Sequence, residues 1–236
     1  MNEWAPRRFW TEVEVAPEGG AFAVTLDGRP VRTPRKARLL VPTRAFAEAV
    51  AEEWRAQEDV VDPRAMPATR LANAALDTVR ASREEVVDAL AGYGATDLLC
   101  YRAERPEALA RRQGAGWDPL LAWAAEALGA DLAVARGVMP VPQPPAGLAR
   151  LRERVAAFDD FGLAAFHDLV ALSGSLVLAL AVAMGRLDPE EAWRLSRLDE
   201  DHQIEEWGED EEAAEAAAAR RAAFLDAARF LRLLDA

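Results

Sequence analysis

Residues 22–33 read FAVTLDGRPVRT, and this stretch decides the fold of the first part of the chain. Apolar residues alternate with smaller or polar ones up to Leu26, which is the period of a half-buried strand. Asp27 and Gly28 follow at once, and this pair is a strong hairpin signal because both residue types tolerate a positive φ angle. The stretch therefore predicts a β-hairpin whose return strand covers residues 31–33.

Two further strands are predicted around this hairpin. Val13 and Val15 alternate with glutamates, and residues 38–41 have the same strand-like composition. Basic residues in this region are interleaved with apolar ones, so we expect them on the solvent-facing side of a small antiparallel sheet. These basic residues are Arg29, Arg32, Arg35, Lys36 and Arg38.

Helical patterns follow the sheet almost to the end of the chain. Thr43 is a suitable N-cap for a helix from Arg44 to about Gln57. Later helix starts are predicted at Ser82, which opens a capping box, and at Asp118-Pro119, where proline would occupy the first helical position.

The last third of the chain predicts two long helices. Asp188-Pro189 is a strong helix start, and this helix is expected to run to Trp207 and to end at Gly208. The alanine-rich segment from Glu211 to Leu234 predicts a final helix.

The predicted fold class is α+β. A small antiparallel β N-terminal domain with one helix is expected over residues 1–62, and a larger all-helical C-terminal domain over residues 63–236. Asp62-Pro63 and Met66-Pro67 mark an extended connection at this boundary, since the residue before proline disfavours helix.

Composition restricts the classes of partner. The net charge of −12 and the pI of about 4.8 argue against nucleic acid and against an anionic membrane surface. The most apolar stretch, residues 169–184, is shorter than the roughly 20 residues that span a bilayer, so we expect a buried helix and no membrane insertion. Residues 1–10 have no apolar core of signal-peptide length.

The single cysteine, Cys100, cannot form a disulfide within the chain, and we expect a small buried hydrophobe in a reducing compartment. Arginine supplies every basic side chain except Lys36, which together with abundant alanine is typical of a GC-rich bacterial genome. The expected location is therefore the bacterial cytoplasm.

Motifs for catalysis or for a cofactor are not found. The sequence contains no glycine-rich phosphate loop and no nucleophile elbow, and His167 is expected to be a structural hydrogen-bonding residue. Asp199 and His202 stand three residues apart, as ligands in carboxylate-bridged helix bundles do. No second such motif completes a metal site, so we predict neither a metal nor a cofactor.

An acidic run over residues 199–212 is the most informative feature for function. Like charges at this density repel one another, so a chain retains them for solubility or for a partner of opposite charge. Trp207 within the run favours a partner, because a solvating segment needs no tryptophan. The predicted helix places an apolar seam between carboxylates, which suits docking to a basic partner surface; the seam residues are Trp193, Arg197, Glu200, Ile204 and Trp207.

Several short segments, taken in order, resemble the Atp12 family, the assembly chaperones of the F1 sector of ATP synthase. The resemblance covers nearly the whole chain, and it lies in the order and the number of its matching segments. These are RFW at 8–10, VTLDGRPVRTP at 24–34, EWRAQ at 53–57, MPATRLAN at 66–73, TDLLCYR at 96–102, WDPL at 117–120, EEAW at 190–193 and QIEEWG at 203–208.

This resemblance implies a β-rich N-terminal domain, a helical C-terminal domain and no catalysis. It implies a protein that binds the unassembled F1 α subunit and shields the surface that later meets β, with eukaryotic relatives in the mitochondrial matrix. A monomer is our default expectation. After Trp-Gly the family carries Glu and then His-Asp; Glu211 fits this pattern, whereas Ala214 and Glu215 replace the pair. The residues expected to contact the partner are Gln203, Glu206, Trp207, Gly208, Glu211 and Trp54.

Two alternatives remain open at this stage. One is a hydrolase that uses clustered carboxylates, with or without a divalent metal ion. The other is a non-catalytic scaffold whose acidic face only interacts with solvent. Trp54 carries a second expectation, because its predicted helix faces the domain junction: its removal should act mostly through stability.

Overall fold

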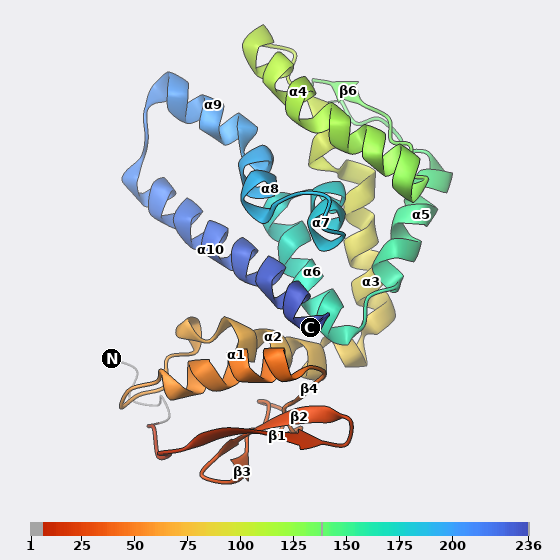
Figure 1. Ribbon diagram of the computed structural model, residues 1–236. Helices are drawn as coiled ribbons and strands as arrows, with labels where there is room; N and C mark the ends of the chain where they lie inside the picture. Colours follow the sequence, from red (N-terminus) through yellow and green to blue (C-terminus); the bar gives the residue numbers. More distant parts are fainter. Residues whose placement is uncertain (1–6, 138, 236) are drawn as a thin grey trace. The chain divides into compact units, whose positions relative to one another are not determined.

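The computed structural model describes residues 7–137 and 139–235 (Figure 1). These residues form two compact units. The first unit takes its described residues from Met1–Arg83, Asp160–Ala165 and Arg229–Ala236, and the second from Glu84–Asp159 and Phe166–Ala228. A small antiparallel sheet near the N-terminus and a larger helical part confirm the predicted α+β class. The predicted domain boundary at residue 62 stays a prediction.

The sheet of the first unit is built around the predicted hairpin. Its strands are β1 (Val13–Glu18), β2 (Ala21–Leu26), β3 (Arg29–Pro30) and β4 (Leu40–Val41), and β2 pairs antiparallel with each of the other three. Asp27 and Gly28 form the turn between β2 and β3 with φ angles of 46° and 75°, as predicted. The Asp27 carboxylate accepts hydrogen bonds from the backbone of Thr11 at 3.0 Å and of Glu12 at 2.8 Å, which joins the turn to the start of β1.

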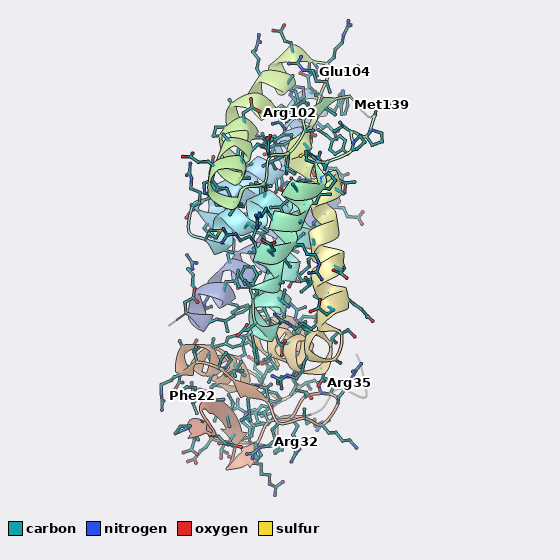
Figure 2. The ribbon with its side chains drawn as sticks, turned by 90° about the vertical axis from the view of Figure 1, so that its right-hand side faces the viewer. Phe22, Arg32, Arg35, Arg102, Glu104 and Met139 are labelled. Atoms are coloured by element: carbon teal, nitrogen blue, oxygen red, sulfur yellow. The ribbon has the colours of Figure 1, made fainter. Side chains whose placement is uncertain are left out.

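The predicted return strand over residues 31–33 is wrong in its limits. Regular pairing stops at Pro30, and beyond it only a single bridge joins Arg32 to Arg38. The chain reverses again at Lys36, whose φ angle is 69°, so the segment is too short for a regular ladder. The basic residues of this region are exposed as predicted, and Arg32 and Arg35 lie at the surface of the unit (Figure 2).

Helix α1 (Arg44–Arg55) packs on this sheet. Thr43 caps it by accepting a hydrogen bond from the amide of Phe46 at 3.1 Å, as predicted. Phe46 and Val50 are fully buried, and the Phe46 ring contacts the rings of Phe161 and Phe230 within the same unit. The remaining helices of the unit are η1 (Pro63–Ala65), α2 (Pro67–Asp77) and η2 (Val79–Ala81).

The second unit is a bundle of helices around α7 (Leu176–Ala183), whose residues 176–181 are all buried. Asp97 joins the start of this helix to an earlier segment. Its carboxylate accepts hydrogen bonds from Val177 N at 3.0 Å, Ser175 Oγ at 2.7 Å and Leu99 N at 3.0 Å. The other helices that lie wholly or mostly in this unit are α3 (Arg83–Gly92), η3 (Tyr93–Thr96), η4 (Leu98–Cys100), α4 (Glu107–Trp123), η5 (Ala124–Leu128), α5 (Pro145–Ala156), α6 (Asp160–Ser173), α8 (Pro189–Ser196), α9 (Leu198–Trp207) and α10 (Glu211–Leu234). The first six residues of α6 and the last six of α10 belong to the first unit.

The detail of this unit corrects three predictions. A short parallel pair, β5 (Tyr101–Arg102) with β6 (Ala135–Arg136), means that the predicted C-terminal domain is not all-helical. The apolar stretch from 169 to 184 is not one helix, because Gly174 takes a φ angle of 70° and separates α6 from α7. Pro119 does not begin a helix but lies inside α4, where Trp117 and Leu120 continue one buried face across it.

The acidic region also differs from its prediction. The helix that starts at Asp188 ends at Ser196, and a separate helix, α9, begins at Leu198, because Arg197 leaves the helical region with φ −115° and ψ 14°. Ser196 Oγ donates to Trp193 O at 2.7 Å, and the Arg197 guanidinium lies 5.6 Å from the centre of the Trp193 ring. The predicted stripe from Trp193 to Trp207 therefore does not lie on one helix. Gly208 ends α9 and α10 runs from Glu211, both as predicted.

Two further expectations concern single side chains. Cys100 is fully buried, and this burial raises the pKa of its thiol to about 12, so the side chain is an unreactive part of the core. His167 is exposed, and its Nδ1 lies 3.1 Å from the Asp168 carboxylate, which raises the pKa of the imidazole. Within the described residues, no helix combines the length and the apolar character that a membrane span requires.

Candidate functional site

Helix α9 carries most of the acidic run, and polar contacts hold it against α4 (Figure 1). Arg112 on α4 donates to both carboxylate oxygens of Glu205, at 2.8 and 2.9 Å. The next residue on α4 is Gln113, and its Nε2 donates to Asp199 Oδ1 at 2.5 Å. Asp199 and Glu205 therefore have partners on the neighbouring helix, and these bonds set how α9 lies on α4.

A buried tryptophan joins α4 to α8, the helix that precedes α9. Trp117 on α4 is fully buried, and its indole N–H donates to Leu195 O on α8 at 2.8 Å. The Arg102 guanidinium lies 4.9 Å from the centre of the Trp117 ring. Gly116 permits the close approach of the helices, because a Cβ atom at this position would lie 2.6 Å from Leu195 Cδ2.

An apolar groove of about 700 Å³ opens between the start of α4 and the end of α9. We call it the Trp207 groove. The α9 side of its lining consists of His202, Gln203, Glu206 and Trp207, and the opposite side of Arg105, Pro106, Glu107 and Leu109. Trp207 is 81% exposed, the largest exposed fraction of any large apolar side chain in the described part of the chain.

The turn after α9 brings further carboxylates to this end of the molecule. Gly208 takes a φ angle of 90°, and Asp210 then caps α10 by accepting a hydrogen bond from the amide of Ala213 at 2.8 Å. Glu211 and Glu212 form the exposed first turn of α10, where the positive end of the helix dipole favours acidic residues. Three residues of the acidic run, Asp210, Glu211 and Glu212, are therefore explained by the capping and the dipole of α10.

The pKa values of two carboxylates on α9, Glu205 and Asp201, are shifted in opposite directions. Hydrogen bonds from Arg112 hold the pKa of Glu205 below its ordinary value, so this carboxylate stays ionised. Partial burial raises the pKa of Asp201, although Arg197 lies within 3.9 Å and acts in the opposite direction. The exposed end, from Gln203 to Trp207, forms the wall of the groove and faces solvent.

The structure brings together three of the predicted contact residues. Gln203, Glu206 and Trp207 line the Trp207 groove. Gly208 follows directly and is exposed, while Glu211 is exposed at the start of α10 and does not line the groove.

Trp54 does not line this groove and belongs to the first unit. It is half-buried, and its ring meets the Trp10 ring edge-on with centroids 5.1 Å apart. Trp10 Nε1 also donates to Trp54 O at 3.3 Å. The Trp54 indole N–H is buried and has no hydrogen-bond partner among the described residues.

Sequence reasoning missed the α4 side of the groove. Leu109 and Arg112 stand far from α9 in sequence, and only the packing of the two helices brings them near Trp207 and Glu205. No local pattern marks such a pairing. Among residues 7–137 and 139–235, no group of three or more His, Cys, Asp or Glu side chains could hold a metal ion.

Comparisons with known proteins agree with this architecture. A crystal structure of Atp12 from Paracoccus denitrificans is 54% identical, with a TM-score of 0.94, and the match covers 98% of this chain and 100% of that chain. A solved structure from Agrobacterium tumefaciens is 44% identical, with a TM-score of 0.93, over 97% of this chain and 86% of that one. The fission yeast (Schizosaccharomyces pombe) protein named "Protein atp12, mitochondrial" is 27% identical over 221 residues, which are 89% of this chain and 76% of the relative.

A family model described as ATP12 chaperone protein matches residues 7–125. This range contains the hairpin, α1 and the whole of α4. The match, together with a relative of known structure that is 54% identical over nearly the full length, shows that this chain belongs to the ATP12 chaperone family.

Proposed function

We propose that this chain binds the unassembled α subunit of the F1 sector of ATP synthase at the Trp207 groove and shields the surface that later meets β. One observation carries the proposal: Trp207, 81% exposed, stands over an apolar groove on an acidic helix. Membership of the ATP12 chaperone family supports it.

Trp207 and the groove beside it form one apolar surface, and an exposed apolar surface rimmed by polar residues marks an interaction site. Tryptophan is the residue that most often dominates the binding energy of an interface, since it buries a large area with few rotatable bonds. The groove beside Trp207 can accept an apolar side chain of the partner, and Trp207 can pack over it. The same features would be costly on a protein without a partner.

The charges around the groove match a basic partner surface. Glu206 lines the groove, and Glu209, Glu211 and Glu212 are exposed close to it in sequence. None of these four glutamates forms an ion pair with a residue that the structure describes, whereas Glu205 is paired with Arg112. These exposed carboxylates accelerate encounter with a basic surface and select against acidic ones.

Release requires an interface of limited size. A chaperone for assembly must yield its client to the permanent neighbour, so an exposed anchor with a charged, hydrated rim is suitable and a large apolar interface is not. The proposed complex is therefore of the transient class, with affinity that falls as salt rises. We further propose that the chain is a monomer of the bacterial cytoplasm.

A catalytic role is not part of the proposal. Three carboxylates of the acidic run have structural partners: Asp199 accepts from Gln113, Glu205 from Arg112, and Asp210 caps α10. The alternative of a purely solvating acidic face does not explain why Trp207 is exposed beside a groove.

The test is calorimetry of purified F1 α subunit with wild-type chain and with Trp207→Ala. We expect the variant to bind more weakly by about 2 kcal/mol, the scale of an interface hot spot. Met139→Ala is the matched control, because Met139 is 75% exposed in the second unit and outside the groove (Figure 2). Unchanged melting temperatures must accompany the result. Equal affinity of Trp207→Ala and wild type would overturn the proposal.

A further inference from the structure

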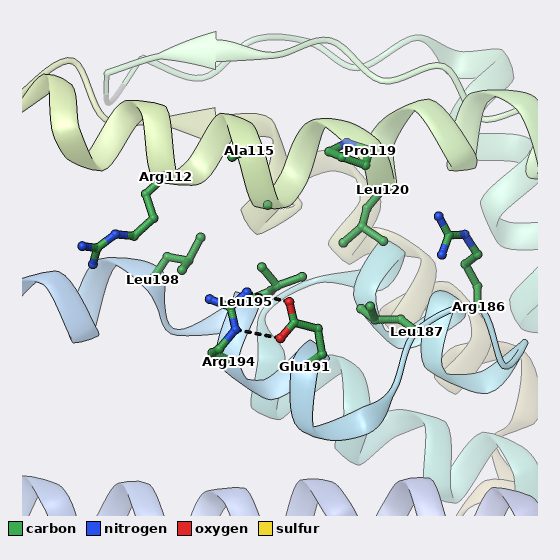
Figure 3. A pocket seen from close by; sticks show the side chains of 11 residues that line it. Arg112, Ala115, Pro119, Leu120, Arg186, Leu187, Glu191, Arg194, Leu195 and Leu198 are labelled. Carbon is green, nitrogen blue, oxygen red and sulfur yellow. Dashed lines mark hydrogen bonds and ion pairs between the residues drawn. The ribbon is translucent and has the colours of Figure 1, made fainter.

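A second groove also lies along α4 and has the opposite charge. It has a volume of about 410 Å³ and lies between α4, α8 and the connection that leads from α7 to α8 (Figure 3). Leu120, Leu195 and Leu198 form its apolar floor. Arg112, Arg186 and Arg194 surround the floor, and we call this site the arginine groove.

The charge of this site is unusual for a protein with a net charge of −12. Glu191 is the one carboxylate in the lining, and it is bound by Arg194 through two hydrogen bonds of 2.7 and 2.5 Å. Arg112 is paired with Glu205. Arg186 is exposed and forms no ion pair with any described residue. The arginine groove therefore presents uncompensated positive charge beside apolar surface.

A backbone feature of α4 adds a hydrogen-bond acceptor. Pro119 lies inside the helix and has no N–H, so the carbonyl of Ala115 has no donor at the usual position four residues later. Both Pro119 and Ala115 line the arginine groove. A polypeptide can supply a backbone N–H to this carbonyl together with a carboxylate for Arg186, whereas a small anion can supply only the carboxylate.

The α4 residues of the two grooves lie in one stripe along the helix. Leu109 lines the Trp207 groove, Arg112 and Gly116 line the arginine groove, and these residues follow one another at helical spacings of three and four. The stripe continues to Leu120 on the floor of the second groove. At 1.5 Å per residue, the two sites are separated by about 14 Å along the helix. One segment of a partner can therefore occupy both.

We propose that the arginine groove binds an acidic–apolar segment of the client polypeptide, next to the segment held at the Trp207 groove. This inference rests on the proposed function, because it takes the same client. The basic patch of the client would lie at the Trp207 groove and its acidic patch at the arginine groove. The client is then bound in one orientation only, since the reversed orientation would place like charges together at both grooves. The pair of grooves therefore determines which surface of the client is covered.

Charge reversal at Arg186 tests the proposal without disturbing the fold, because this side chain is exposed and unpaired among the described residues. Arg154→Glu is the matched control: Arg154 is likewise exposed in the second unit, has no ion pair there and does not line the groove. A second variant, Ala115→Trp, fills the groove from an exposed position on α4.

Two binding measurements use the full-length chain. Calorimetry with purified F1 α subunit should show about fivefold weaker binding for Arg186→Glu and for Ala115→Trp, and no change for Arg154→Glu. Fluorescence anisotropy with a labelled 15-residue peptide of leucine and glutamate should show binding to wild type that Arg186→Glu abolishes and Trp207→Ala retains.

The outcomes separate the two proposals. If the α subunit binds in a Trp207-dependent manner but Arg186→Glu behaves like Arg154→Glu and the peptide does not bind, the arginine-groove proposal is wrong and the proposed function stands. If the α subunit does not bind wild type while the peptide binds in an Arg186-dependent manner, the proposed client is wrong and the arginine groove retains its specificity for acidic–apolar segments.

Discussion

Trp117 and Trp207 lie on two helices that pack together, and their surroundings are opposite. Trp117 on α4 is fully buried, donates its indole N–H to Leu195 O and lies under the Arg102 guanidinium. Trp207 on α9 is 81% exposed and has no ring partner among the described residues. The same residue type therefore stabilises the fold at one position and is available to a partner at the other.

Within the pair of helices α4 and α9, the buried tryptophan therefore contributes to stability and the exposed one to binding. A buried tryptophan contributes the area that it removes from water and the hydrogen bond that it satisfies. An exposed tryptophan contributes neither to the folded chain, so its free energy is realised only in a complex. Substitutions at the two positions should accordingly change different measurements, and the following predictions test that separation.

Trp117→Ala should have the largest effect. Removal of a fully buried indole leaves a cavity and an unsatisfied carbonyl at Leu195, which costs about 3–5 kcal/mol of unfolding free energy. Chemical denaturation measures this loss, with Trp207→Ala as the comparison, for which we expect a change below about 0.5 kcal/mol. Similar destabilisation by both substitutions would contradict the separation of roles.

Trp54→Ala should be intermediate and should act through the fold. The ring is half-buried against Trp10, and its loss removes an edge-on aromatic contact and part of the packing of α1, at a cost of about 2 kcal/mol. We expect weaker binding of the F1 α subunit only as a consequence of the lower melting temperature of the variant. A Trp54→Ala chain with wild-type stability that fails to bind would instead make Trp54 a contact residue, like Trp207.

Gly208→Ala should cost about 1–2 kcal/mol and should do so through the backbone alone. Gly208 takes φ 90° and ψ 167°, a region that is accessible essentially only to glycine, yet a Cβ atom there would meet nothing within 4 Å. The strain falls on the turn that follows Trp207, so the position of Trp207 should change and affinity for the α subunit should fall.

Gly92→Ala is the matched control for this turn. Its Cβ atom would also meet nothing within 4 Å, but Gly92 has an ordinary helical conformation with φ −56°. Alanine there should raise stability by about 0.5–1 kcal/mol. Thermal unfolding of both variants distinguishes backbone strain at Gly208 from a general effect of adding a methyl group.

The sequence predicted the local features of the molecule and missed the contacts between distant segments. The turn at Asp27-Gly28, the cap at Thr43 and the break at Gly208 were predictable because each depends on the conformational range of one or two residues. The acidic run with Trp207 could likewise be recognised from composition.

Two helix limits failed for a common physical reason. At Pro119 the local rule favoured a helix start, but the buried face formed by Trp117 and Leu120 continues the helix across the proline. At Arg197 no helix-breaking residue is present, and the break accompanies packing of the guanidinium on Trp193. The α4 wall of the Trp207 groove was unpredictable for the same reason, since it exists only after α4 and α9 pack together.

The contact between Arg112 and Glu205 should have the smallest effect on stability, and pH is the way to observe it. Because Arg112 holds the pKa of Glu205 below its ordinary value of 4.5, the folded chain binds a proton at this site less readily than the unfolded chain does. The contribution is therefore fully present above the ordinary pKa and disappears as pH falls through the folded value. Glu205→Gln should remove this component, so wild type and variant should differ at pH 7 and converge in acid.

Glu153→Gln is the control, because Glu153 forms an exposed ion pair with Arg150 on α5 and has no ion pair with α4 or α9. Urea denaturation at several pH values gives the required comparison. If Glu205→Gln also weakens binding of the α subunit at pH 7 while stability is nearly unchanged, the Arg112 contact orients Trp207 in addition to fastening α9. The exposed Trp207 would then depend on the neighbouring helix α4 for its position, as the buried Trp117 depends on the neighbouring helix α8 for its hydrogen bond.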